Sequence, residues 1–134
     1  MAHMEGKYTN EKNENLDEYF KGLGVPYIPR KLICSSRPTM EISKNNDEWT
    51  ISTSTMFRTS SSKFKFGEEY EETMPGGTIK NVTQMEGDNK LITNSVGPGE
   101  VRSSRKYEFI GDECVITYTS DQSPQVAKRY FKRC

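Results

Sequence analysis

The spacing of hydrophobic and polar positions changes once along this chain. Between residues 16 and 35, apolar side chains recur every three or four positions, as they do on one face of a helix. From Arg37 onward, apolar and polar side chains alternate in short runs that Gly, Pro, Asn and Asp interrupt. Such runs are typical of antiparallel strands with one buried face. The pattern predicts two short helices followed by a long series of strands.

The expected elements can be placed by residue. A first strand covers residues 6–12, a first helix follows Asn15, and a second helix covers about 27–35, since Pro29 is tolerated only in a first helical turn. The further strands are expected at 40–42, 49–53, 57–66, 68–72, 79–85, 91–96, 101–109, 114–119 and 126–133. Short turns between consecutive strands predict an all-β fold, an antiparallel up-and-down meander with a helix-turn-helix lid. Closure into a ten-stranded β-barrel would remove its exposed edges.

The composition modifies this picture. Hydrophobic residues make up 32% of the 134 residues, which is lean for a filled core. Disorder is one explanation, but seven Tyr, six Phe and one Trp recur along the whole chain, and disordered segments are poor in aromatic residues. We favour the other explanation, a shell of strands around a lined cavity.

Charge and segment content exclude several classes of protein. The 19 basic and 19 acidic residues balance, which argues against a nucleic-acid-binding protein. The chain has no apolar run of transmembrane length and no apolar signal region at its start. We interpret Met1–His3 as a cloning scar, and we expect one cytoplasmic domain over residues 1–134.

The residues of catalysis and metal binding are scarce. The only histidine is His3, so neither a Ser-His-Asp triad nor a histidine metal site is expected. Cys34, Cys114 and Cys134 are too widely spaced for a metal motif, and we expect three unpaired thiols. Consecutive carboxylates such as those of the acidic run Glu68–Glu72 are usually solvated, so we expect this run to lie on the surface. We therefore predict a protein that is not an enzyme and has no cofactor.

Several short motifs occur in a fixed order along the chain. They are Gly6-x-Tyr8, Asn15-Leu16-Asp17, Leu23-Gly24-Val25, Arg30-Lys31, Arg37-Pro38-Thr39, Thr55-Met56-Phe57-Arg58, Phe66-Gly67-Glu68-Glu69-Tyr70, Glu86-Gly87-Asp88 and Lys128-Arg129-Tyr130. In this order the chain resembles the intracellular lipid-binding proteins, the fatty-acid-binding protein family, over nearly its whole length. It departs from the family at Leu16, where Phe is usual, and at Asn10, where an apolar residue is usual.

The resemblance implies a monomeric carrier of the calycin type that holds a long-chain fatty acid in a closed barrel and transports it. A portal formed by the second helix and two strand turns would include Ile28, Lys31, Leu32, Phe57 and Pro75–Gly77. The candidates for contact with the ligand tail are Tyr19, Ile28, Leu32, Phe57, Ile116 and Tyr118. A retinoid-type ligand and a membrane-associated interaction protein remain alternatives.

The resemblance also points to a site for the ligand carboxylate. Many members of the family use a basic residue on the eighth strand and an Arg-x-Tyr pair on the last strand. Here the last strand offers Lys128-x-Tyr130, and we expect this pair to face inward, with Arg129 and Arg133 facing outward.

On the eighth strand the usual basic position holds Tyr107, and Arg105 precedes it on the same face. An isolated buried cation is costly, and a ligand carboxylate would neutralise it. We predict an anion site made by Lys128 and Tyr130 and assisted by Arg105 or Tyr107. Alternatively, Arg105 leans out to water and Tyr107 is ordinary lining.

The helical pair also carries positive charge. Lys21, Arg30 and Lys31 match places where some members of the family dock on anionic membranes or bind import factors. Attraction to an anionic bilayer is worth about 1 kcal/mol per charge. Solvated helix faces explain the same residues equally well, so transient membrane contact is left as an open expectation.

Overall fold

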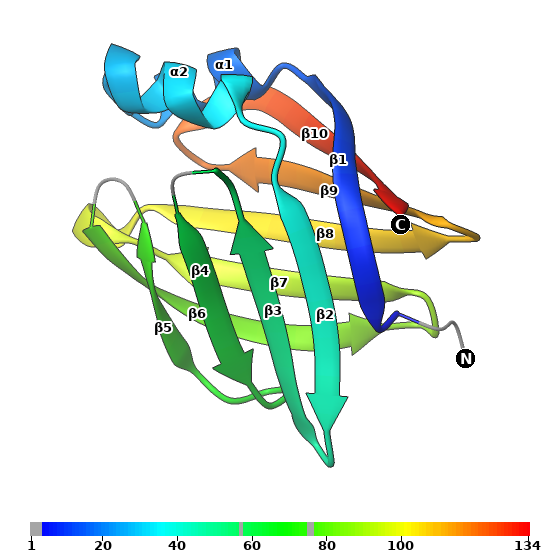
Figure 1. Ribbon diagram of the computed structural model, residues 1–134. Helices are drawn as coiled ribbons and strands as arrows, with labels where there is room; N and C mark the ends of the chain where they lie inside the picture. The colour runs from blue at the N-terminus through cyan, green and yellow to red at the C-terminus, as the bar shows by residue number, and fades with distance from the viewer. Residues whose placement is uncertain (1–3, 57, 75–76) are drawn as a thin grey trace.

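The computed structural model of the protein describes residues 4–56, 58–74 and 77–134. Strands form most of this part of the chain, and two helices follow the first strand (Figure 1). The elements are β1 (Gly6–Glu14), α1 (Leu16–Gly22), α2 (Tyr27–Ser35), β2 (Thr39–Asn45), β3 (Glu48–Ser54), β4 (Thr59–Phe64), β5 (Tyr70–Met74), β6 (Gly77–Glu86), β7 (Lys90–Val96), η1 (Pro98–Glu100, a 3-10 turn), β8 (Arg102–Ile110), β9 (Glu113–Ser120) and β10 (Ser123–Arg133). The predicted order of helices and strands is confirmed.

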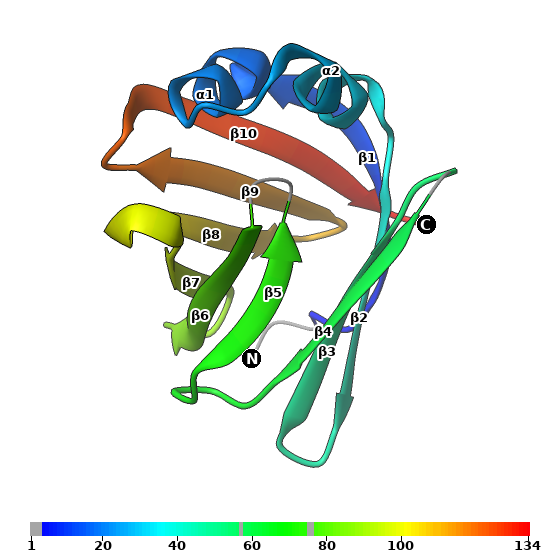
Figure 2. The same ribbon diagram turned by 90° about the vertical axis from the view of Figure 1, so that its left-hand side faces the viewer.

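The ten strands form one antiparallel sheet in the order β4-β3-β2-β1-β10-β9-β8-β7-β6-β5. The pairing of β1 with β10 joins the two ends of the chain and bends the sheet around an interior (Figure 2). The predicted up-and-down barrel is thus confirmed. Closure is incomplete, however, because β4 and β5 stand at opposite ends of the strand order and no ladder joins their described residues.

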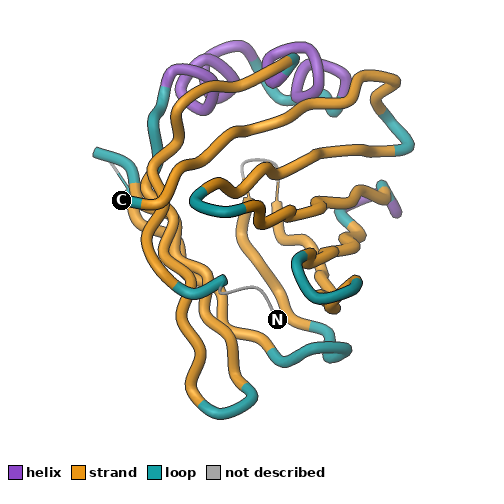
Figure 3. The backbone as a smooth tube through the Cα atoms, turned by 90° about the vertical axis from the view of Figure 1, so that its right-hand side faces the viewer, coloured by secondary structure: helices purple, strands orange, loops and turns teal. Residues whose placement is uncertain are grey.

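The two helices cover one end of the barrel (Figure 3). Asn15 precedes α1 in a left-handed conformation, with φ of 54°, and its side-chain amide donates to the Val126 carbonyl of β10. Leu16 and Tyr19 are buried in a small cluster with Ala127. Gly22 allows α1 to approach Ser123 of β10 closely, because a Cβ at Gly22 would lie 2.5 Å from the Ser123 hydroxyl oxygen. The lid is therefore anchored on β10 through α1.

A larger apolar cluster joins side chains of β1–β4 with side chains of β7–β10 across the interior. Trp49 stacks on Phe66, and Phe64 stacks on Tyr70, with ring centres 5.3 and 5.0 Å apart. The interior between this cluster and the lid is where the structure leaves a cavity.

Candidate ligand-binding cavity

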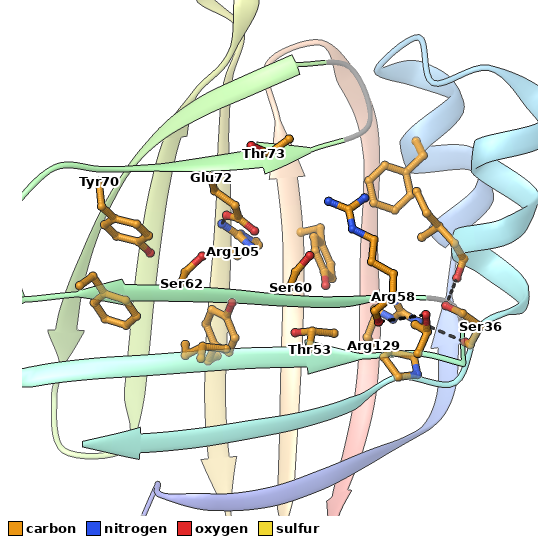
Figure 4. Close-up of a pocket in the computed structure, with 18 residues that line it drawn as sticks. Ser36, Thr53, Arg58, Ser60, Ser62, Tyr70, Glu72, Thr73, Arg105 and Arg129 are labelled. Carbon is orange, nitrogen blue, oxygen red and sulfur yellow. Dashed lines mark hydrogen bonds and ion pairs between the residues drawn. The ribbon is translucent and has the colours of Figure 1, made fainter. Parts of the chain in front are cut away.

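The interior holds a hollow of about 250 Å³ with charged walls. Three arginines and one acid line it: Arg58, Glu72, Arg105 and Arg129 (Figure 4). Phe20 and Ile33 of the lid and Tyr107 and Tyr118 of the strands add aromatic and aliphatic surface. We call this space the arginine compartment. Its mixture of cations and apolar groups suits an amphipathic anion.

Arg105 points into this compartment from β8 and already has an anionic partner. Its Nη2 donates to Glu72 Oε1 at 2.8 Å, and both side chains are less than one-fifth exposed. Asn81 Nδ2 donates to the same carboxylate oxygen at 2.8 Å. The predicted inward position of Arg105 is confirmed, and the expectation that Glu72 is solvated is wrong.

The charges of this pair are held in place by their surroundings. Burial pushes the pKa of Glu72 up, but the charge and hydrogen bond of Arg105, together with Asn81, outweigh it and keep that pKa below its ordinary value. Burial also opposes the charge of Arg105, while Tyr107 and Glu72 outweigh burial and raise its pKa. Both groups therefore remain ionised at neutral pH, and their charges largely cancel.

Arg129 lies elsewhere in the compartment and has a different environment (Figure 4). It is only 8% exposed. Its Nε donates to Asn13 Oδ1 at 3.1 Å, and its Nη2 donates to Asn10 Oδ1 at 3.5 Å and to the Ser36 carbonyl at 3.4 Å. These acceptors are neutral oxygens, and no carboxylate among the described residues forms an ion pair with Arg129.

The inward-facing residues of β10 differ from the prediction. Ala127, Arg129 and Phe131 are buried, so the expectation that Arg129 faces outward is wrong. Lys128 lies between these buried positions on the opposite face, and it does not line the arginine compartment. The pairing of β10 with β9 shifts register between Ser123 and Ala127. Val126, Lys128 and Tyr130 do share one face of the strand, but it is the outer face, since Val126 is 46% exposed.

Tyr130 likewise stands on the outer side of the barrel wall. Its hydroxyl donates to Glu14 Oε1 at 2.8 Å, and Lys12 Nζ lies 4.7 Å from the centre of its ring. The Glu14 hydrogen bond is also the main reason why the pKa of Tyr130 is raised. The predicted inward orientation of Lys128 and Tyr130 is therefore wrong. Arg133 reaches the hydroxyl of Tyr8 at 2.8 Å.

With the faces corrected, the inward pair on β10 is Arg129-x-Phe131. The aromatic ring is kept relative to the Arg-x-Tyr pattern, but the hydroxyl donor is missing. Tyr107 and Tyr118 line the compartment beside Arg105, and burial raises the pKa of each, so both are neutral hydrogen-bond donors at physiological pH.

The remaining predicted residues fall in several places. Tyr19 is buried under α1, where its hydroxyl donates to the Thr119 carbonyl at 3.2 Å. Ile116 belongs to the large apolar cluster and does not line the arginine compartment. Ile28 and Leu32 are 71% and 58% exposed on α2. Phe57 and the Pro75–Gly76 part of the expected portal lie outside the described residues.

The basic residues of the lid are partly neutralised. Asp17 Oδ1 accepts from Arg30 Nε at 2.8 Å and lies 3.3 Å from Lys31 Nζ. The Arg30 hydrogen bond is the main reason why the pKa of Asp17 is lowered. Lys21 is exposed at the end of α1. Among the described residues, no helix is long and apolar enough to cross a membrane.

Comparison with known proteins gives one family. A sequence profile of the lipocalin / cytosolic fatty-acid binding protein family matches residues 5–121. The chain belongs to this family. A fatty acid-binding protein of Tyrophagus putrescentiae is 35% identical over 134 residues, covering 99% of each chain. Cellular retinoic acid-binding protein 2 of Mus musculus is 35% identical over 128 residues, covering 90% of this chain and 92% of the mouse protein.

The fold of the family is equally clear in solved structures. A fatty acid binding protein of Schistosoma mansoni in complex with arachidonic acid superimposes with a TM-score of 0.89 at 29% identity. The match covers 96% of this chain and 94% of the other. The family is one of lipid-binding carriers, which agrees with the predicted fold and with the resemblance read from the motifs.

Some residues of the candidate site escaped the sequence analysis. Arg129 was assigned to the wrong face, and Glu72, Asn10 and Asn13 were not considered part of the site. The only signal was Asn10 itself, a polar residue where the family usually has an apolar one. In the structure it is 3% exposed and belongs to the support of Arg129.

Proposed function

We propose that this protein is a cytoplasmic carrier that binds a long-chain fatty acid non-covalently in its interior and transports it as a monomer. The observation that carries the proposal is the buried guanidinium of Arg129, whose partners are neutral oxygens. A ligand carboxylate would supply the missing anion and accept charge-assisted hydrogen bonds from Arg129. Arg105 and Tyr107 assist from β8, with Arg105 weakened by Glu72. The relatives that bind fatty acids support the same ligand class.

The tail of the acid contributes most of the affinity in this proposal. Each CH₂ group transferred from water to an apolar surface is worth about 0.8 kcal/mol. The carboxylate contacts then fix which end of the ligand goes in first. Retinoic acid, which carries the same head group, is the second candidate, because a cellular retinoic acid-binding protein is among the relatives.

The test separates the head group from the tail. Displacement of a fluorescent fatty acid would be measured with oleate and with oleyl alcohol, which share a chain but differ in charge. Arg129→Gln should lower the affinity for oleate by about 30-fold or more, as expected for one partner of a buried charge pair. The affinity for oleyl alcohol should stay nearly unchanged. Competition between oleate and retinoate on the unaltered protein would rank the two candidates.

Lys128→Gln is the matched control, because Lys128 neighbours Arg129 on β10 but faces the other side of the wall. It should bind both ligands like the unaltered protein. Equal loss of oleate and oleyl alcohol in Arg129→Gln would contradict the head-group assignment. Failure of the unaltered protein to bind any lipid acid would contradict the carrier function.

We further propose that α2 makes transient contact with anionic membranes during ligand transfer. Tyr27, Ile28 and Leu32 are more than half exposed on a helix that also carries Lys31. Exposed apolar side chains beside cations are typical of surfaces that lie on a bilayer. Flotation with phosphatidylserine vesicles should recover the protein, and Leu32→Ser should reduce the recovery. Binding that Leu32→Ser leaves unchanged would contradict this role for α2.

A further inference from the structure

The interior contains a second hollow, and Tyr19, Arg105 and Tyr118 are the predicted ligand contacts that line it. It has a volume of about 540 Å³ and lies beneath α1, between β6 and the η1–β8 segment, whose arrangement is visible in Figure 2. Leu23, Val25, Ile79 and Val101 make its lining mainly apolar, with Ser95, Ser103, Arg105 and Gln122 as its polar members. We call it the side compartment.

The side compartment adjoins the arginine compartment. Phe20, Ile33, Arg105 and Tyr118 line both spaces, so these four side chains form the boundary between them. A carboxylate bound among the arginines therefore has the apolar space directly beyond Tyr118. Ile28 and Leu32, the expected tail contacts on α2, line neither compartment.

The two compartments differ in size and chemistry in a complementary way. Pockets for drug-sized ligands have volumes of roughly 300–1,000 Å³. The arginine compartment, at about 250 Å³, falls below this range, whereas the side compartment, at about 540 Å³, lies within it. Apolar surface predominates in both linings but more strongly in the larger space, whereas the guanidinium groups of Arg58 and Arg129 and the hydroxyls of Ser60 and Ser62 line only the smaller one. A long hydrocarbon chain is better placed in the larger, apolar space.

We infer that the side compartment is the binding site for the methyl end of the ligand. The head group stays at Arg129, and the chain bends past Tyr118 to end between Ile79 and Val101. This inference rests on the proposed function and narrows the ligand class to acids with a long, flexible chain. A rigid conjugated chain cannot make that bend, so retinoic acid is disfavoured.

The first test uses chain length. In the unaltered protein, the affinity for saturated acids should rise about fourfold for each added CH₂ from decanoate to stearate. Val101→Trp fills the side compartment. The affinity of this variant for decanoate should stay within twofold of that of the unaltered protein. For the longer acids, its affinity should no longer rise with each added CH₂. Ile110→Trp is the control, because Ile110 is 60% exposed on the same stretch of chain and should keep the fourfold increment.

The second test needs no substitution. Oleate with ¹³C in its terminal methyl group should show nuclear Overhauser contacts to the methyl groups of Ile79 and Val101. Contacts to Ile28 and Leu32 instead would overturn the inference, as would an unbroken fourfold increment in Val101→Trp. Either result would leave the carrier function standing, whereas an unaltered protein that binds no acid of any length would overturn both.

Discussion

The two buried arginines of the cavity are alike in type and position but differ in what surrounds them. Arg105 on β8 and Arg129 on β10 both line the arginine compartment. Arg105 meets the Glu72 carboxylate at 2.8 Å, whereas Arg129 meets the side-chain oxygens of Asn10 and Asn13 and the carbonyl of Ser36. The first cation is neutralised from within the protein, and the second is only solvated by it.

This difference separates two uses of a buried charge. An internal ion pair satisfies both partners, and removing one of them leaves the other uncompensated at a cost of several kcal/mol. A cation surrounded by neutral acceptors is oriented while its charge remains uncompensated. The same residue type is therefore neutralised by the protein at one place and, at the other, stands where we propose that the ligand carboxylate binds.

The largest effect is expected from breaking the internal pair. Glu72→Gln keeps the hydrogen bonding with Asn81 but leaves Arg105 without a counter-charge, so the free energy of unfolding should fall by about 3 kcal/mol. The freed arginine should at the same time bind oleate about tenfold more tightly. Urea unfolding and ligand displacement measure the two quantities.

Opposite changes in stability and affinity are the signature of this variant. Glu71→Gln on the same strand is the matched control, because Glu71 is exposed and should change neither quantity. A Glu72→Gln protein that loses oleate affinity would show that Glu72 helps the ligand to bind and would contradict the comparison between the two arginines.

A smaller effect is expected from removing the support of the second arginine. Asn10→Leu introduces the apolar character that is usual in the family, and it removes one hydrogen bond to Arg129 worth about 1 kcal/mol. Oleate affinity should fall about fivefold, while oleyl alcohol affinity should hold. Asn45→Leu, at an exposed end of β2, should change neither. Parallel losses for both ligands would mean that Asn10 only maintains the fold.

The smallest effect is expected from lowering the pH, which protonates Glu72 and so changes the stability of the folded protein. The pKa of Glu72 is lowered in the folded protein because the Arg105 and Asn81 contacts outweigh burial, which acts against them. A lowered folded-state pKa contributes stability that is present above the unfolded value of about 4.5 and is lost as pH falls through the folded value.

The stability gap between the unaltered protein and Glu72→Gln should therefore narrow below about pH 4.5. Urea unfolding of both proteins at a series of pH values measures this gap. Because burial and pairing act in opposite directions on Glu72, the narrowing should be modest. A gap that stays constant into acid would show that the carboxylate is not the source of the stability difference.

The fold could be predicted from the sequence because its signals are local. The helical spacing that begins at Leu16 and the alternation around Tyr107 and Phe109 each report a buried face directly. Leu16, Tyr107 and Phe109 are all buried in the structure. The three cysteines are unpaired as expected.

The site could be predicted only in part, because its signals are not local. Alternation along β10 puts Lys128 and Arg129 on opposite faces but does not say which face is buried, and the apolar residue Val126 stands on the outer one. Glu72 stands in an acidic run that looks solvated, and its partner Arg105 is 33 residues away in the sequence. Arg105 itself was placed correctly, because regular alternation along β8 has no interruption.

The barrel wall has one line, between β4 and β5, that no strand ladder closes among the described residues. Their neighbouring edges are held by side chains, such as the stacked rings of Phe64 and Tyr70, with no ladder of backbone hydrogen bonds between their described residues. Widening the wall at this seam separates side chains but breaks no strand pairing. This line is therefore where the wall can open at the lowest cost in hydrogen bonds, while the paired strands keep their register.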